Sequence, residues 1–276
     1  MKKSSELEKI LMKGVENMKK LTFIFLIITF VLTYAQGVDV SQLLNASKPS
    51  SVVAQPYIIR ATLVPGSSEG VYTIGVEGYL DIFGLNLSLG TTVEYPNFEL
   101  NQPVYVGLGI STSGLFVALS SNVPNFEQIS DLSAYETPTV AFGIASYKKT
   151  SFLFASWSRF ELSFENRGVF KKQDGQFVLN DSLDWLNATV NFKVESCDVG
   201  YFLFRFTVPS LKDVLGGSFT YTWELALPVS MIYVYVGQPG NNDWVFGLGI
   251  ANSFFNAVGK YNVQTGQVTW IVSAQM

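Results

Sequence analysis

The sequence predicts an all-β fold, most simply an antiparallel β-sandwich, and three observations support this. Runs rich in Val, Ile, Phe and Tyr alternate with short clusters of Gly, Pro, Asn and Ser. Within several runs, apolar and polar residues alternate with a period of two, which is typical of antiparallel strands with one face in water. Helix signals are confined to two short pieces, residues 41–44 and 209–215. Together these patterns favour strands joined by tight turns.

The candidate strands follow one another along most of the chain. In order, they are residues 57–63, 71–76, 86–94, 104–110, 115–120, 139–147, 151–164, 176–179, 189–195, 201–208, 219–227, 231–236, 245–251 and 267–273.

The two faces of the longest candidate strand differ sharply in polarity. In residues 151–164, one face carries aromatic side chains, whereas the other carries Trp157, Arg159 and Glu161. Residues 219–227 alternate in the same way. We expect the apolar face of each strand to be the core face. The predicted core residues are therefore Phe152, Phe154, Phe160, Phe204, Phe206, Trp223 and Leu225.

Two segments share the tetrapeptide Gly-Leu-Gly-Ile, at residues 107–110 and 247–250. Glycine at alternate positions leaves one face of a strand nearly bare. We therefore expect a backbone, an aromatic ring or a ligand to approach closely there.

The composition excludes several kinds of chemistry. The chain has 276 residues, of which 48% are hydrophobic and only 14% charged, against about 25% charged in an average soluble domain. It has no histidine, which excludes a Ser/His/Asp triad and any His-ligated metal. A single cysteine, Cys197, cannot form an intramolecular disulfide or a Cys-rich cluster. Carboxylate chemistry, oxygen-ligated metals and non-catalytic functions remain.

The N-terminal region predicts export. Met18-Lys19-Lys20, the apolar run 21–32 and the small residues Thr33 and Ala35 form a secretory signal peptide over residues 18–35. We interpret residues 1–17 as a start-site artefact, residues 36–55 as a tether and residues 56–276 as a single domain. The apolar run is short for a spanning helix. The expected location is the bacterial periplasm, outer envelope or extracellular space.

Charge and cysteine placement limit the partners. Of 18 Lys and Arg and 22 Asp and Glu residues, six and three respectively lie in the first 35 positions, so the remainder has a net charge of −7. Without clustered basic residues, a nucleic-acid partner is not expected. No cysteine follows the predicted cleavage site, so no covalent lipid anchor is expected.

Three segments together resemble one family of β-sandwiches. Residues 74–84, Ile-Gly-Val-Glu-Gly-Tyr-Leu-Asp-Ile-Phe-Gly, resemble the opening strand and turn of the DOMON-like, type 9 carbohydrate-binding-module group of bacterial proteins. Residues 104–106 with 113–118 are similar to its next hairpin, and residues 201–211 to a later strand and helical turn. Phe83 replaces the usual Trp, and Arg205 stands where the group has an acid. The resemblance implies a sandwich and a glycan ligand.

Aromatic residues in turn-rich segments are the candidate ligand site. Trp185 and Trp244 lie among polar residues whose side chains can hydrogen-bond sugar hydroxyls. The candidate hydrogen-bonding residues are Asp184, Asn187, Asn242 and Asp243. Either tryptophan can instead fold back to cap a sheet end.

Two acidic pairs are weaker candidates for Ca²⁺, and no other cofactor is expected. Glu77 and Asp81 flank a turn, where Asp81 more simply bonds nearby amides in an Asx turn. Asp181 and Asp184 are more simply part of a solvated loop.

Three functions fit these observations. The first is an exported, non-catalytic module that binds carbohydrate through loop aromatics. The second is an outer-membrane β-barrel or envelope structural protein, which alone would make the membrane a partner. Against it, candidate strands 71–76, 115–120 and 231–236 are short, and no terminal aromatic follows residue 273. The third is a glycoside hydrolase, for which no acid pair stands out.

Overall fold

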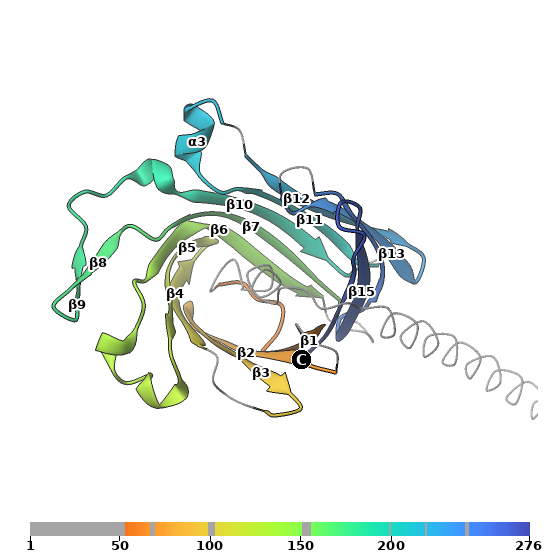
Figure 1. Ribbon diagram of the computed structural model, residues 1–276, viewed down its shortest axis with the longest axis horizontal. Helices are drawn as coiled ribbons and strands as arrows, with labels where there is room; N and C mark the ends of the chain where they lie inside the picture. Colours follow the sequence, from red (N-terminus) through yellow and green to blue (C-terminus); the bar gives the residue numbers. More distant parts are fainter. Residues whose placement is uncertain are drawn as a thin grey trace, which may run out of the picture. The chain divides into compact units, whose positions relative to one another are not determined.

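The main strands of the protein close into one antiparallel barrel. The structure is a computed structural model that describes residues 53–66, 70–98, 103–150, 156–198, 200–218, 220–240 and 243–276. Fourteen strands form the ring, in the order β1-β16-β15-β14-β13-β12-β11-β10-β7-β6-β5-β4-β3-β2 (Figure 1). The all-β prediction is confirmed, and the closed ring fits the barrel alternative rather than the sandwich. The strands do not form the two packed sheets of the predicted sandwich, because β1 pairs with β16 and closes the ring.

The strands run, in chain order, over Ile59–Pro65 (β1), Tyr72–Ile82 (β2), Leu85–Tyr95 (β3), Val104–Thr112 (β4), Leu115–Val123 (β5), Thr139–Thr150 (β6), Ser156–Asn166 (β7), Phe170–Gln173 (β8), Gln176–Leu179 (β9), Thr189–Ser196 (β10), Phe202–Val208 (β11), Thr222–Val229 (β12), Ile232–Gln238 (β13), Val245–Ala251 (β14), Phe255–Asn262 (β15) and Val268–Gln275 (β16). Short helices span Phe126–Gln128 (η1), Leu132–Ala134 (η2), Trp185–Asn187 (η3) and Leu211–Leu215 (α3). Strands β8 and β9 form a separate hairpin.

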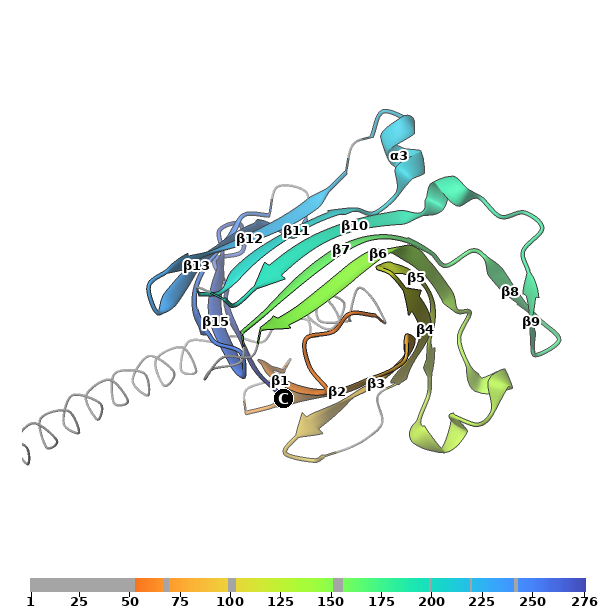
Figure 2. The ribbon, with the colours of Figure 1, turned by 180° about the vertical axis from the view of Figure 1, so that it is seen from behind.

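The two ends of the barrel have different connections. At one end, which we call the short-turn end, two-residue turns join β2 to β3, β4 to β5 and β12 to β13. There Phe83 and Gly84 both have positive φ, as a tight hairpin requires. The chain enters β1 and leaves β16 at this end. The opposite, long-loop end carries η1, η2, the β8–β9 hairpin, η3 and α3, and Figure 2 shows α3 and the hairpin extending beyond the barrel strands.

Sequence patterns found most of these elements. Every predicted strand overlaps an observed one, but β8 and β15 were not predicted. Strand β15 contains Ala257 and Gly259 among polar residues, so its pattern is weak. Helix α3 confirms the short helical piece near residues 209–215. The predicted helix at 41–44, the artefact and the signal peptide lie outside the described residues.

The polarity of the wall is the reverse of the one predicted. Phe160 lies on the outer face of β7, whereas Arg159 and Glu161 are buried inside. The core prediction is therefore wrong for Phe160, Phe204, Phe206, Trp223 and Leu225, all half-buried on the outer face. Alternation defines two faces but not which one meets the interior. Phe152 and Phe154 lie outside the described residues.

Apolar side chains cover the outer face around the ring. Within the strand residues that the structure describes, Lys148 near the end of β6 is the one charged residue whose register places it outward. Strongly exposed examples are Leu85, Leu87, Leu108, Ile110, Leu115, Val117, Phe142, Ile144, Leu227, Val234, Phe246 and Leu248. Among the helices described, none is long and apolar enough to cross a membrane.

Candidate functional site in the barrel lumen

Charged side chains on the inner face form closely spaced ion pairs. Arg159 Nη2 lies 2.5 Å from Glu161 Oε2 on β7, and Lys193 Nζ lies 2.6 Å from Glu195 Oε2 on β10. Residues two apart on a strand share a face, so each pair points into the lumen together. Arg159 is 3% exposed and Glu161 is 0% exposed. Each charge is held by its partner, because an unpaired charge in such an interior would be costly.

Neighbouring strands continue this network around the wall. The register places Arg205 of β11 opposite Glu224 of β12, and their side chains meet at 2.9 Å. Lys260 Nζ of β15 lies 3.6 Å from the other oxygen of Glu224 and 3.9 Å from the centroid of the Tyr235 ring. Arg205 thus has an acidic partner on the inner face of the wall.

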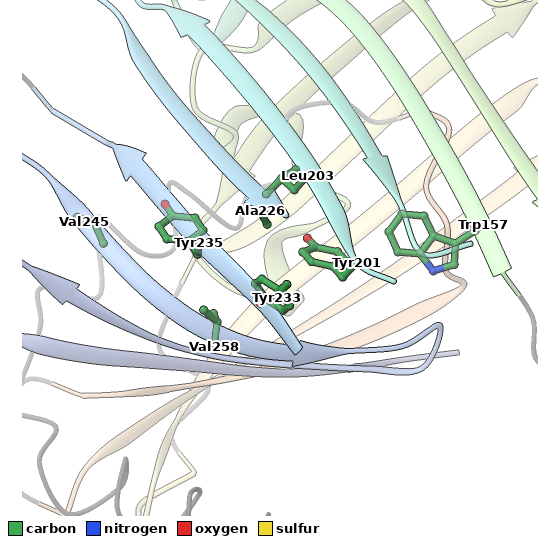
Figure 3. Close-up of a cluster of buried hydrophobic side chains, with 8 residues drawn as sticks. All are labelled: Trp157, Tyr201, Leu203, Ala226, Tyr233, Tyr235, Val245 and Val258. Carbon is green, nitrogen blue, oxygen red and sulfur yellow. The ribbon is translucent and has the colours of Figure 1, made fainter. Parts of the chain in front are cut away.

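Tyrosines bond the same carboxylates and form the apolar part of the lumen. Tyr201 donates a hydrogen bond to Glu195 at 2.8 Å, and Tyr235 donates one to Glu224 at 2.6 Å. Tyr201 and Tyr233 are in ring contact, with centroids 4.8 Å apart. Figure 3 shows these rings with Trp157 in one buried cluster. Each hydroxyl thus occupies one acceptor oxygen of its carboxylate.

Both Gly-Leu-Gly-Ile segments provide the close approach that the sequence predicts. A Cβ on Gly249 would lie 2.3 Å from the Tyr233 ring, so the ring occupies the space a side chain would need. A Cβ on Gly109 would lie 3.0 Å from Val53 Cγ1. One segment thus receives an aromatic ring, and the other receives a chain segment.

A cavity of about 150 Å³ follows the charged part of the wall. Arg60, Lys193, Glu195, Arg205, Glu224 and Lys260 are among its lining residues. Charged side chains of both signs, with more cations than carboxylates, and tyrosine hydroxyls give it both donors and acceptors. Such a lining suits water and small hydrophilic solutes.

The polar face of these strands can be seen in the sequence, but its alternation is interpreted above as a face that contacts water outside the sheets. Arg159, Glu161 and Glu224 were recognised as one face of their strands, opposite aromatic residues. Basic and acidic residues at alternate positions in adjacent strands could have indicated that opposite charges pair between neighbouring strands. Lys193 and Glu195 follow the same rule, whereas the register places Lys260 beside Gly247 and Thr269.

The structure places Trp185 in η3 at the long-loop end. Its ring is 55% exposed and meets Phe142 of β6 edge-on, with centroids 6.4 Å apart. Asp184 caps η3 by accepting from the Leu186 amide at 3.0 Å, and it pairs with Lys212 of α3 at 2.8 Å. The hydrogen bonds from Lys212 and Leu186 lower the pKa of Asp184. Asn187 is exposed beside it.

Trp244 lies at the same end but beside different strands. Its ring is 41% exposed, with centroids 5.7 Å from Trp223 and 6.2 Å from Phe246. Asp243 precedes it, and Asn242 lies outside the described residues. The two tryptophan rings contact different aromatic residues. The ligand-binding roles of these residues stay predictions.

The acidic pairs are engaged in protein contacts. Asp81 accepts from the Gly84 amide at 3.0 Å, which confirms the Asx-type turn, and Glu77 pairs with Arg60 at 2.7 Å. Asp181 pairs with Lys171. Within the described part of the chain, no three His, Cys, Asp or Glu side chains are grouped as a metal site.

Fold and site together define a closed antiparallel barrel with an apolar exterior and a paired-charge interior. No protein-family model matches the sequence, and no curated protein matches it significantly. The DOMON-like resemblance therefore stays a prediction.

Proposed function

We propose that this protein is a membrane-spanning β-barrel of a bacterial cell envelope. The observation that carries the proposal is the reversed wall, with apolar residues outward and paired charges inward. In water, a continuous apolar exterior of this extent would be an aggregation hazard, whereas in a bilayer it contacts hydrocarbon. A closed ring also leaves no unpaired strand edge in the lipid.

The connections support the same proposal. Membrane barrels of bacteria have an even number of strands, short turns at one end and longer loops at the other. The fourteen strands, the short-turn end and the long-loop end follow that pattern. Aromatic residues near the long-loop end, including Trp223 and Trp244, fit the aromatic girdle of a membrane interface.

Two of the three candidate strands that are short in the sequence belong to longer observed strands, although β1 and β10 to β16 have 7 or 8 residues each. Candidate 71–76 is part of β2, which has 11 residues, and candidate 115–120 is part of β5, which has 9. A tilted strand needs about 9–11 residues to cross the hydrocarbon core. Only the third candidate remains short, because β13 has 7 residues.

Vesicle flotation tests this proposal. The full chain would be folded in detergent, reconstituted with phosphatidylcholine vesicles, washed with urea and centrifuged through a density gradient. We expect the barrel to float with the vesicles after the wash. A protein that stays folded and monodisperse without detergent, and remains at the bottom of the gradient, would overturn the proposal.

Carbohydrate binding at the long-loop end stays a separate hypothesis. Trp185 and Trp244 both keep exposed ring surface at that end. A glycan would stack there on the exposed rings, outside the wall.

A further inference from the structure

A barrel of fourteen strands is wider than its own side chains readily fill. Eight-stranded barrels are just filled by side chains, whereas barrels of 16–18 strands leave an aqueous channel. Residues 53–58, which lie directly before β1, run through the lumen, and Figure 1 shows this segment curving inside the ring of strands. We call residues 53–58 the N-terminal stopper.

The stopper is anchored first on a patch of small residues. Val53 is completely buried and clusters with Phe116, Ala118, Ala141 and Ala145 on the inner face of β5 and β6. Gly109 of β4 leaves room for Val53 Cγ1, which lies 3.0 Å from where a Cβ would be. Small inward residues on this side of the lumen thus form a seat for the stopper. The opposite side carries the long charged side chains.

Hydrogen bonds attach the stopper to several other strands. Arg159 Nη2 of β7 lies 3.4 Å from the Val53 carbonyl oxygen, which accepts its hydrogen bond, and the Ala54 amide donates to Tyr79 Oη of β2 at 3.1 Å. Tyr147 of β6 donates to the Pro56 carbonyl at 3.5 Å. These hydrogen bonds hold the segment between opposite parts of the wall. Their lengths range from ordinary to long.

Cavities lie along the stopper. One of about 600 Å³ is formed by the stopper together with residues at the short-turn end, including Ser111, Gly114 and Lys149. The cavity of about 150 Å³ follows the charged wall. Gln55 is 4% exposed and lines both. Gln55 of the stopper thus borders both spaces.

We propose that the barrel is a channel for small hydrophilic ions and that residues 53–58 close it, an inference that rests on the proposed membrane function. Displacing the stopper from its seat joins the two cavities. The cavity along the charged wall is lined by five cations, Arg60, Arg159, Lys193, Arg205 and Lys260, and by two carboxylates, Glu195 and Glu224, so a small anion finds more counter-charges along it than a small cation does.

A reversible cross-link tests this inference. The test uses Val53→Cys/Gly109→Cys in a Cys197→Ser background. A Cβ at residue 109 lies 3.0 Å from Val53 Cγ1, so the two cysteines are close enough for a disulfide. The full-length variant would be reconstituted in planar bilayers in KCl. We expect oxidation to abolish channel openings and reduction to restore them. The single variant Val53→Cys in the same background should not respond to oxidant.

A matched pair of glycine substitutions gives the opposite effect. Gly109→Val adds a side chain directly against Val53 and should raise the open probability several-fold. Gly75→Val adds the same side chain to the inner face of β2, where the nearest atom is 3.9 Å from the new Cβ, and should leave the open probability unchanged.

The outcomes separate the channel from the membrane proposal. Flotation of each variant reports insertion independently of conductance. If the variants insert but the disulfide does not form, conductance does not change with redox state, or both glycine variants behave alike, the stopper is overturned and the membrane barrel stands. If the wild-type chain does not insert, the membrane proposal fails and the channel fails with it.

Discussion

The two faces of strand β7 differ sharply in polarity and in exposure. Phe160, Leu162 and Phe164 point outward and remain partly exposed, whereas Arg159, Glu161 and Ser163 point inward and are buried. Outward, Phe160 meets Phe192 of β10, with ring centroids 5.6 Å apart. Inward, Ser163 donates a hydrogen bond to Glu161 at 3.0 Å. The polarity of a face therefore does not by itself decide whether that face is buried.

The largest expected effect comes from breaking an inner pair. Glu161→Ala leaves Arg159 buried without its carboxylate and should destabilise the protein by about 3–5 kcal/mol. The double variant Arg159→Met/Glu161→Leu removes both charges and should recover most of that loss. Urea unfolding in lipid vesicles measures both. If the single and double variants lose the same stability, the charges do not depend on each other.

A smaller effect is expected when a charge is added to the outer face. Leu248 of β14 is 62% exposed, so in water Leu248→Arg would change stability little. At the middle of a bilayer, an arginine on the lipid face costs about 2–4 kcal/mol. Leu132→Arg, in η2 at the long-loop end, is the matched control because Leu132 is 73% exposed on a loop. Equal unfolding free energies for the two variants in vesicles would contradict a lipid environment around β14.

Much of the fold could be predicted from the sequence because a period of two is a local property. The alternation of Phe160, Leu162 and Phe164 with Arg159, Glu161 and Ser163 defines a strand and its two faces wherever the strand lies. The Gly-Leu-Gly-Ile segments likewise predict close approach from local geometry alone.

The closure of the barrel and the site could not be predicted in this way. Closure depends on the pairing of β1 with β16, which are about 200 residues apart and carry no shared local pattern. The partner of Arg205 is known only once the register places Glu224 opposite it. Val53 was assigned to a tether because nothing in its neighbourhood indicates the seat at Gly109 and Ala118.

The smallest effect is expected for a charge pair that lies outside the wall. Lys212 lowers the pKa of Asp184, so this pair contributes stability above the ordinary range of an aspartate and loses it as the pH falls through the lowered pKa. The Asp184 side chain is 33% exposed and the Lys212 side chain 58%, so water screens the pair far more than it screens Glu161.

Asp184→Asn keeps an oxygen that accepts from the Leu186 amide and removes only the charge. Its urea midpoint should lie slightly below that of the wild type at pH 7, and the difference should shrink as the pH falls through the lowered pKa of Asp184. Asp174→Asn, in the β8–β9 turn, makes the same charge change away from Lys212. A loss of stability in Asp184→Asn that equals the loss in Glu161→Ala would show that the outer charges are as strongly coupled as the inner ones. A loss that grows at low pH would contradict the expected pH dependence of the pair.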